Sequence, residues 1–288
     1  MPTIDRTQII NYYDTTWLDY RIAWMNSENL AMHHGYWDQT TRGHGDSLLN
    51  MNRELAAMVR IEPGMRVLDA GCGVGGSSIW LAENFEVNVV GISLSADQIR
   101  RARESAHSRN VDDRVTFQVA DFVDSGLDPS SFDVVWALES CCHAADKRAF
   151  AAEAFRLLRP GGQLAVGDGF RLSRTLSEND EDLLRSLLAS WAVNDICTVS
   201  EFIDLTQQTG FSDARARDIS PNVYPSVQRL SWMATVYQPI GWLLHKLAVR
   251  PRATYSNVVA AKLTGKSFRR HLACYALVAA RKEDSSGN

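Results

Sequence analysis

The chain has 288 residues, of which 45% are hydrophobic, so it can bury one large core or one core with an added cap. Its formal net charge of −4 leaves no overall positive field of the kind that binds nucleic acid or anionic lipid. We therefore expect no nucleic-acid partner and favour a small molecule.

The cysteines and the hydrophobic runs indicate in which cellular compartment the protein is expected. The cysteines are odd in number, scattered and without the paired spacing of a metal site: Cys72, Cys141, Cys142, Cys197 and Cys274. No hydrophobic signal segment opens the sequence, so a reduced, cytoplasmic protein is expected. The longest apolar run, 272–280, is about half of the roughly 18 residues that a membrane-spanning helix needs. It predicts a buried strand and no stable membrane insertion.

Residues 1–62 precede a regular alternation of patterns. From residue 66 to residue 170, short β-branched runs alternate with helical patterns. Strands are predicted at 66–69, 87–92, 115–120, 134–138 and 163–167. The helices between them begin near Ser77, Ser95 and Asp146. This alternation predicts a parallel, doubly wound sheet, which binds ligands beyond the carboxyl ends of its strands.

The chain after residue 170 adds strands and apolar insertions. Residues 211–219 and 271–281 are predicted to complete the sheet. Residues 183–193 and 222–247 are rich in apolar and aromatic side chains and predict a helical cap. Packing of cap helices on the sheet and an apolar substrate pocket both account for this composition. Candidate substrate contacts in the cap are Trp191, Tyr224, Trp232, Met233 and Tyr237.

A buried strand runs straight into a glycine-rich turn at residues 67–76 (VLDAGCGVGG). Glycine permits positive φ and close approach of the backbone to a ligand, and the following helix points its N-terminus at that ligand. Gly71, Gly73 and Gly76 fit a G-x-G-x-x-G pattern, which NAD enzymes share. Asp69 changes the balance, because its carboxylate would repel a pyrophosphate but can accept hydrogen bonds from a cationic amino-acid group. The turn therefore favours S-adenosylmethionine as the cofactor.

Four motifs stand in order along the chain: residues 67–73 (VLDAGCG), 119–122 (VADF), 132–135 (FDVV) and 158–162 (LRPGG). Together they resemble the class I S-adenosylmethionine-dependent methyltransferases. The resemblance implies an α/β fold with a Rossmann-like, doubly wound, mostly parallel seven-stranded sheet, an N-terminal helical lid and C-terminal helical cap insertions. The chain is divided accordingly into the lid (1–62), the cofactor-binding core (63–170) and the rest of the sheet with its substrate cap (171–288, with cap helices at 183–196 and 222–268).

Two N-terminal stretches narrow the resemblance: residues 11–14 (NYYD) and 32–38 (MHHGYWD). They are similar to the branch that contains tocopherol methyltransferases, cyclopropane fatty-acid synthases, and bacterial small-molecule and fatty-acid O-methyltransferases, in which the leading helices fold over the cofactor. The resemblance implies cofactor contacts at Tyr12 and His34 and substrate contacts at Tyr13 and Tyr36. No acidic or cysteine partner stands at helical spacing from the paired histidines, so no metal site is predicted.

The remaining cofactor contacts follow from the same resemblance. No carboxylate ends the second strand at 91–95 (GISLS), which counts against NAD, whose ribose expects an acid about 20 residues after the glycines. In the narrowed branch Ser93, Leu94 and Gln98 contact the nucleoside instead. Asp121 is expected to accept from the adenine amino group. The predicted cofactor contacts are Tyr12, His34, Asp69, Ala70, Gly71, Gly73, Ser93, Leu94, Gln98, Asp121, Phe122 and Glu139.

The chemistry is expected after the fourth strand, at residues 137–143 (ALESCCH). His143 has a near-neutral ordinary pKa and is the candidate base for a hydroxyl substrate. Asp168 matches an acidic position of sugar and natural-product O-methyltransferases and is expected to pair with His143 and orient its ring. Glu139 is expected to orient the substrate or the methionyl end of the cofactor. The alternative is that His143 caps the following helix and Asp168 begins a loop.

The predicted function is O-methylation of a hydrophobic small molecule, with S-adenosylhomocysteine as the product. The acceptor is a carboxylate, as in a fatty or aromatic acid, or a hydroxyl of a natural product. A carboxylate is already ionised and needs no base, so His143, Tyr12 and Tyr36 would then act through hydrogen bonds. Lipid C-methylation or cyclopropanation, an NAD-dependent oxidoreductase and a binding module without turnover stay open, as does a homodimer.

Overall fold

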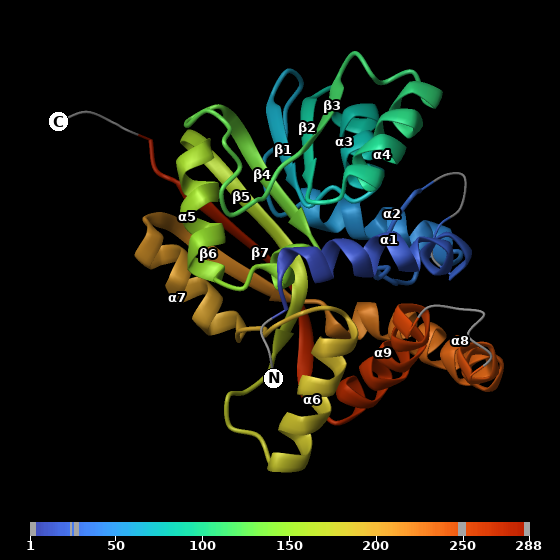
Figure 1. Cartoon of the computed structure of the whole chain (residues 1–288). Coiled ribbons are helices and arrows are strands. Elements are labelled where there is room, and N and C mark those ends of the chain that lie inside the picture. The colour runs from blue at the N-terminus through green and yellow to red at the C-terminus, as the bar shows by residue number, and fades with distance from the viewer. Residues whose placement is uncertain (1–3, 24, 26–28, 247–251, 285–288) are drawn as a thin grey trace.

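The computed structural model describes residues 4–23, 25, 29–246 and 252–284. Its centre is a seven-stranded sheet in the order β3-β2-β1-β4-β5-β7-β6 (Figure 1). The strands are β1 (Arg66–Ala70), β2 (Asn88–Ser93), β3 (Val115–Val119), β4 (Phe132–Leu138), β5 (Leu158–Arg171), β6 (Phe211–Asp218) and β7 (Ala273–Lys282). β1 to β5 pair in parallel, and β7 runs antiparallel to both β5 and β6. The predicted mostly parallel α/β sheet is confirmed, with β5 longer than expected.

Helices cover both faces of the sheet. One face packs against α2 (His44–Ala56), α3 (Gly76–Phe85) and α4 (Ala96–Ser108), and the other against α5 (Lys147–Leu157) and α7 (Val199–Thr209). α4 begins where expected, because the Ser95 side chain accepts a hydrogen bond from the backbone N–H of Gln98. α5 begins in the same way, with Asp146 accepting from the N–H of Arg148.

The N-terminal helix α1 (Arg6–Ala23) lies across the carboxyl ends of the parallel strands (Figure 1). Three contacts tie it to the loop after β3 and to α4: Arg6 with Asp121 at 2.6 Å, Asp14 with Ser95 at 2.5 Å, and the Trp17 ring with Arg101 at 4.3 Å. A parallel sheet binds its ligands at this end. α1 therefore covers the expected binding edge.

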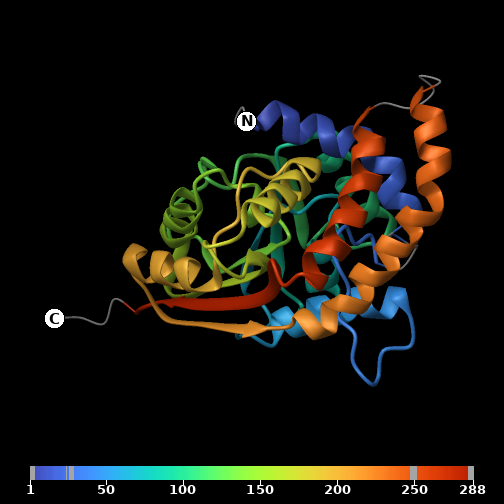
Figure 2. The same ribbon diagram turned by 90° about the horizontal axis from the view of Figure 1, so that it is seen from below.

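Three C-terminal helices form the cap: α6 (Glu178–Ser190), α8 (Ser220–Lys246) and α9 (Arg252–Arg269). α8 and α9 run side by side along one edge of the molecule (Figure 2), and α9 also packs against α6 and α1. The helical cap is thus confirmed, although residues 247–251 of the predicted cap lie outside the described residues. Within the part of the chain that the structure describes, no helix combines the length and apolar character needed to cross a bilayer.

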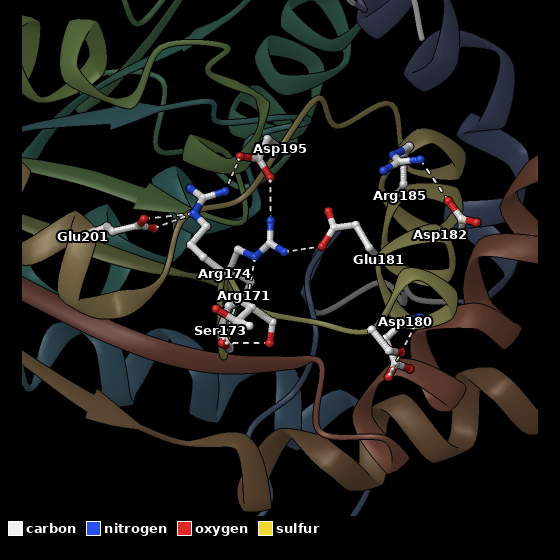
Figure 3. A network of polar contacts seen from close by, with 11 residues as sticks. Arg171, Ser173, Arg174, Asp180, Glu181, Asp182, Arg185, Asp195 and Glu201 are labelled. Carbon is white, nitrogen blue, oxygen red and sulfur yellow. Dashed lines mark hydrogen bonds and ion pairs between the residues drawn. The ribbon is translucent and has the colours of Figure 1, made fainter.

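An ion-pair network anchors the cap to the end of β5 (Figure 3). Arg171 is buried, and its guanidinium lies 2.6 Å from Glu181 of α6 and 3.5 Å from Asp195. Arg174 reaches the same Asp195 at 2.7 Å and Glu201 of α7 at 2.9 Å. Because a buried charge is costly to leave unpaired, this network holds α6 and α7 in place relative to β5.

Candidate active site

Two adjoining cavities lie at the carboxyl ends of the strands, against α1. The first is lined by α1, the turn after β1, the start of α4 and the loop after β3. The second is lined mainly by apolar side chains of α6, α9 and the loop after α6. Four residues line both cavities and mark where they meet: Tyr13, Met32, Glu139 and His143.

The turn after β1 brings the backbone against the first cavity. Gly71 and Gly73 have φ values of +97° and +53°, which favour glycine. A Cβ on Gly71 would lie 2.3 Å from the Cβ of Ser140, closer than two non-bonded carbon atoms can approach. Only glycine therefore fits at residue 71, where the turn passes close to Ser140 beside the first cavity.

Asp69 lies buried at the end of β1 and lines the first cavity. Its Oδ2 accepts a hydrogen bond of 2.6 Å from the hydroxyl of Ser78. Burial raises the pKa of Asp69 to about 6. A cationic ligand group beside this carboxylate would lower that pKa again, so the site gains from binding positive charge.

Eight of the predicted cofactor contacts line the first cavity: Asp69, Gly71, Gly73, Ser93, Leu94, Gln98, Phe122 and Glu139. The hydroxyl of Ser93 donates to Oε1 of Gln98 at 2.6 Å and so fixes the direction of that amide. Ala70 is buried behind the turn, and its carbonyl accepts from the hydroxyl of Ser140 at 2.6 Å. These residues form one continuous wall, as their spacing on the sheet edge suggested.

Two predicted cofactor contacts lie outside the lining of the first cavity. Asp121 does not line the cavity, because its carboxylate pairs with Arg6 of α1 at 2.6 Å. Tyr12 points away from it, and its hydroxyl donates to Oδ1 of Asn257 on α9 at 2.9 Å. In the structure both residues make contacts that hold α1, and their role as cofactor contacts stays a prediction.

The paired histidines are divided between the two cavities. His34, the predicted cofactor contact, lines the second cavity, while His33 lines the first. The segment around them is neither helix nor strand, so neighbouring side chains can point to opposite sides. Nδ1 of His33 donates to the carbonyl of His34 at 2.9 Å, and its buried Nε2 has no partner among the described residues. His33 therefore offers an acceptor at the first cavity, which the sequence did not indicate.

At the junction of the cavities, the hydroxyl of Tyr13 lies 2.8 Å from Nε2 of His143. Nδ1 of His143 lies 3.1 Å from the carbonyl of Ala192. Because a carbonyl only accepts hydrogen bonds, Nδ1 carries the proton and Nε2 accepts from Tyr13. Burial lowers the pKa of His143 to about 4, so its ring is neutral at neutral pH.

Glu139 is the second polar group at the junction. Its Oε1 accepts from the backbone N–H of His34 at 2.6 Å and from the hydroxyl of Tyr275 at 2.9 Å, and Nδ1 of His34 lies 3.1 Å away. Burial acts to raise the pKa of Glu139, but the charge and hydrogen bonds of His34 outweigh it, so the pKa lies below its usual value. Glu139 is thus held as a carboxylate against the second cavity.

The predicted pair of Asp168 and His143 is wrong. Asp168 accepts hydrogen bonds from the thiol of Cys141 at 3.2 Å, the N–H of Cys142 at 2.9 Å and the N–H of Gly169 at 2.8 Å. These three donors close off its approach to the imidazole. The ring of His143 is oriented by a backbone carbonyl and a tyrosine, while Asp168 places a carboxylate in the wall of the second cavity.

Most of the predicted aromatic substrate contacts lie elsewhere. Tyr13 and Trp191 line the second cavity. The ring of Tyr224 stacks on Phe268, Tyr36 packs against the core, and Trp232, Met233 and Tyr237 also lie outside both cavities. On α8 the buried apolar positions are Val223, Val227, Leu230 and Ala234, whereas Trp232 and Tyr237 are exposed.

Tyr20 and Tyr275 line the second cavity and were missed by the sequence analysis. Tyr275 lies on β7, next to Glu139 on the neighbouring part of the sheet edge. Its strand reads as a continuous apolar run, and nothing in that run marks one tyrosine for the site. Tyr20 shares the helical spacing of Tyr13 on α1, a signal that could have identified it.

Residues 68–166 match the family described as "Methyltransferase domain". The chain is 38% identical over 199 residues to 27-O-demethylrifamycin SV methyltransferase of Amycolatopsis mediterranei (strain S699), an alignment that covers 69% of this chain and 72% of that one. It is 28% identical over 228 residues to a chloroplastic tocopherol O-methyltransferase of Arabidopsis thaliana, covering 73% of this chain and 64% of that one. The chain belongs to the S-adenosylmethionine-dependent methyltransferases.

A solved structure agrees with the fold of the methyltransferase. A cyclopropane synthase from Mycobacterium tuberculosis matches with a TM-score of 0.81 over 97% of this chain and 99% of that chain, at 18% identity. At this identity the likeness shows the fold alone. The family membership confirms the expected class, with S-adenosylmethionine as cofactor and a small molecule as methyl acceptor, and it replaces the alternative of an NAD-dependent oxidoreductase.

Proposed function

We propose that the methyltransferase transfers a methyl group to a hydroxyl oxygen of a hydrophobic small molecule, with S-adenosylmethionine in the first cavity and the acceptor in the second. The observation that supports this most directly is the shared wall of Tyr13, Glu139 and His143. Methyl transfer is an in-line displacement, so it needs two bound molecules in contact and aligned. Two cavities that meet at polar side chains meet this need.

In the first cavity, each proposed contact would bind a different part of the cofactor. Gly71 and Gly73 let the backbone approach, and Asp69 would accept from the cationic amino group. Leu94 and Phe122 offer apolar surface to the adenine. S-adenosylmethionine, when bound, supplies the electrophilic methyl group.

The second cavity favours a neutral acceptor. Leu187, Trp191 and Phe268 give it apolar walls, and Glu139 and Asp168 lie at its polar side. A carboxylate acceptor would bring a further negative charge beside the Glu139 carboxylate, in an enclosed space where charges repel more strongly than in water and where burial already raises the pKa of Asp168. We therefore prefer the hydroxyl to the carboxylate that the sequence left open.

Two relatives are consistent with a hydroxyl acceptor by their names. One is named as a methyltransferase of 27-O-demethylrifamycin SV and the other as a tocopherol O-methyltransferase. Their similarity to this chain supports O-methylation without defining the scaffold that the second cavity takes. The size and apolar lining of that cavity then set which scaffolds fit.

His143 and Tyr13 are proposed to move the proton. The acceptor hydroxyl would give its proton to the Tyr13 oxygen as Tyr13 passes its own to Nε2 of His143, so no net charge is left on the tyrosine. A base with a pKa of about 4 is weak, but it suffices once the acceptor oxygen has begun to take the methyl group and has become strongly acidic. The carbonyl of Ala192 and the carboxylate of Glu139 would stabilise the imidazolium.

Matched acceptors test this proposal. S-adenosylhomocysteine formation would be measured with pairs that differ only in the acceptor group: alkylphenols against alkylbenzoic acids, and long-chain alcohols against fatty acids. We expect turnover with the hydroxyl member of a pair and an O-methyl product by mass spectrometry and NMR. Turnover with the acids alone would contradict the hydroxyl assignment.

A second candidate is C-methylation or cyclopropanation of a lipid alkene. The observation that favours it is the presence of two carboxylates, Glu139 and Asp168, beside the second cavity, because a carbocation intermediate is stabilised by nearby negative charge. NMR of the product separates the two functions. An O–CH₃ signal supports the first proposal, and a new C–CH₃ group or cyclopropane ring supports the second.

A further inference from the structure

Charged residues are unevenly distributed along this chain. No Asp or Glu occurs between Asp218 and Glu283, so all 34 acidic residues lie outside that stretch. The Lys and Arg residues within 220–270 are Arg229, Lys246, Arg250, Arg252, Lys262, Lys266, Arg269 and Arg270. A protein with a net charge of −4 therefore carries a strongly positive segment in α8, α9 and the residues that join them.

α8 also exposes large apolar side chains. Trp232, Val236 and Tyr237 are 69%, 51% and 54% exposed. At about 100° per residue, Trp232 and Val236 lie on the side opposite the buried positions, and Tyr237 lies further round the helix, between those two residues and the buried side. In water such a strip is unfavourable, and exposed apolar strips of this kind mark interaction surfaces.

α9 places cations next to this strip. Lys262 and Lys266 follow each other at one helical turn, and Arg269 lies almost one turn further. Lys262 contacts Gln238, the residue after Tyr237, so the two helices bring the basic and apolar side chains together. Lys266 and Arg269 are exposed.

The other side of α9 belongs to the acceptor site. Thr264 and Phe268, which alternate with the exposed cations along the helix, line the second cavity. One helix thus has an outer basic surface and an inner surface that touches the proposed acceptor. Figure 2 shows α8 and α9 together at the edge of the molecule, where an extended surface can reach them.

We propose that this α8–α9 surface, defined by Trp232, Val236, Tyr237, Lys266 and Arg269, docks the methyltransferase on a membrane surface that contains anionic lipid. Helices that combine aromatic and aliphatic side chains with Lys and Arg lie in the headgroup region, where the rings enter the apolar boundary and the cations meet lipid phosphates. This proposal goes beyond the proposed function and stands without it. It also provides an apolar acceptor with a short route from the bilayer to the second cavity.

A second copy of the chain fits this surface less well. A two-fold contact would place Lys266 and Arg269 of both copies against the same α8–α9 surface, and residues 219–282 of the partner copy offer no Asp or Glu to pair with them. Like charges would then repel. An acidic protein would match the cations but not the three exposed apolar side chains, whereas an anionic membrane matches both.

Vesicle co-sedimentation tests the proposal. The full chain would be mixed with vesicles of phosphatidylcholine alone and of phosphatidylcholine with 30% phosphatidylglycerol, at two salt concentrations. We expect binding to the anionic vesicles that weakens as salt rises, because the charges are exposed. Lys266→Gln with Arg269→Gln should weaken it about 25-fold, since each basic residue near such a surface contributes a factor of about five.

Two sets of variants test the apolar side chains and the specificity of the charges, and cofactor binding serves as a check on folding. Trp232→Ser, Val236→Ser and Tyr237→Ser together should weaken binding by more than about tenfold, whereas Arg60→Gln with Arg185→Gln removes two exposed charges elsewhere and should leave it unchanged. S-adenosylmethionine binding in solution verifies that each variant is folded. Absence of binding to anionic vesicles overturns the proposal, as does equal binding by all variants. Retention on heparin without vesicle binding, or a dimer that the triple serine variant dissociates, would also overturn it.

Discussion

The hydroxyl of Tyr13 on α1 donates to Nε2 of His143 after β4, across 2.8 Å. Of the two groups in the proposed proton route, Tyr13 therefore comes from the helix that covers the sheet edge, and His143 comes from the sheet edge itself. Both groups are therefore in contact only when α1 lies across the sheet edge as it does here.

Removal of either the His143 imidazole or the Tyr13 hydroxyl should slow turnover of a hydroxyl acceptor. We expect His143→Ala to lower kcat by about 10²- to 10⁴-fold, the usual contribution of general acid–base catalysis. Tyr13→Phe should lower it in the same direction, and the double variant should be little worse than His143→Ala, because residues that act as a unit are not additive. Steady-state S-adenosylhomocysteine formation measures this, with the exposed His107→Ala as control. If the loss of kcat in the double variant equals the product of the two single losses, Tyr13 and His143 act independently.

The low pKa of His143 sets a pH dependence of stability. Its folded pKa of about 4 lies below the unfolded value of about 6.5, so folding favours the neutral ring. This contribution is fully present above pH 6.5 and is lost as pH falls through 4. It amounts to at most about 3 kcal/mol. Urea unfolding from pH 7 to pH 4 should therefore show a steeper loss for the wild type than for His143→Asn, and parallel curves would contradict the burial of a neutral ring.

The same pKa predicts the shape of the activity profile. With a hydroxyl acceptor, kcat should stay nearly level from pH 7.5 to pH 5.5, because His143 stays neutral across that range. An ordinary exposed histidine would instead give a fall with a midpoint near 6.5. Stopped-time assays in overlapping buffers measure the profile, and such a midpoint would exclude His143 in the state found here.

Gly71 should tolerate no side chain. Gly71→Ala forces a Cβ to within 2.3 Å of Ser140 at a φ of +97°, so we expect loss of S-adenosylmethionine binding by calorimetry and a stability loss above about 1 kcal/mol. Gly126→Ala is the matched control. It has a similar φ of +69° but nothing within 4 Å of its Cβ, so only the backbone cost remains. Equal effects of the two substitutions would mean that the turn adapts.

The ion pair between the buried Arg171 of β5 and Glu181 of α6 should contribute more to stability than an exposed ion pair within α6. Glu181→Ala removes the carboxylate 2.6 Å from the buried Arg171 and leaves that guanidinium with the carboxylate of Asp195 at 3.5 Å, so we expect a loss of about 3 kcal/mol in urea unfolding. Arg185→Ala breaks the exposed pair with Asp182 and should cost less than about 1 kcal/mol. A similar cost for both would show that solvent screens the network.

Local patterns predicted the sheet edge well, because strand periodicity and a glycine turn depend on neighbouring residues. The wall formed by Asp69, Gly71, Ser93 and Phe122 needed only the rule that parallel strands end together. The partners of His143 did not follow from that rule. Tyr13 reaches it from α1 and Ala192 from the turn after α6, both far away in the sequence, while Asp168 is engaged by three donors next to it in the chain or on the loop after β4.

The sequence did not predict well which way individual side chains point. The exchange of His33 and His34 between cavities depends on the course of an irregular segment, which has no period to read. On α8 the aromatic residues were assigned to the substrate, but a turn of about 100° per residue sends Trp232 outward while Leu230 faces inward. The overall charge of −4 likewise concealed the basic surface of α8 and α9.

By itself, the sequence determined the family, the cofactor and the order of strands and helices, since these follow from short motifs and from hydrophobic periods within single elements. Only the tertiary structure decided which side chains share a cavity. It also decided that Asp168 accepts from Cys141 and that Tyr13 donates to His143. The reason is physical: hydrogen bonds between residues far apart in the chain depend on how whole helices pack, and a shift of one residue in that packing changes which groups meet.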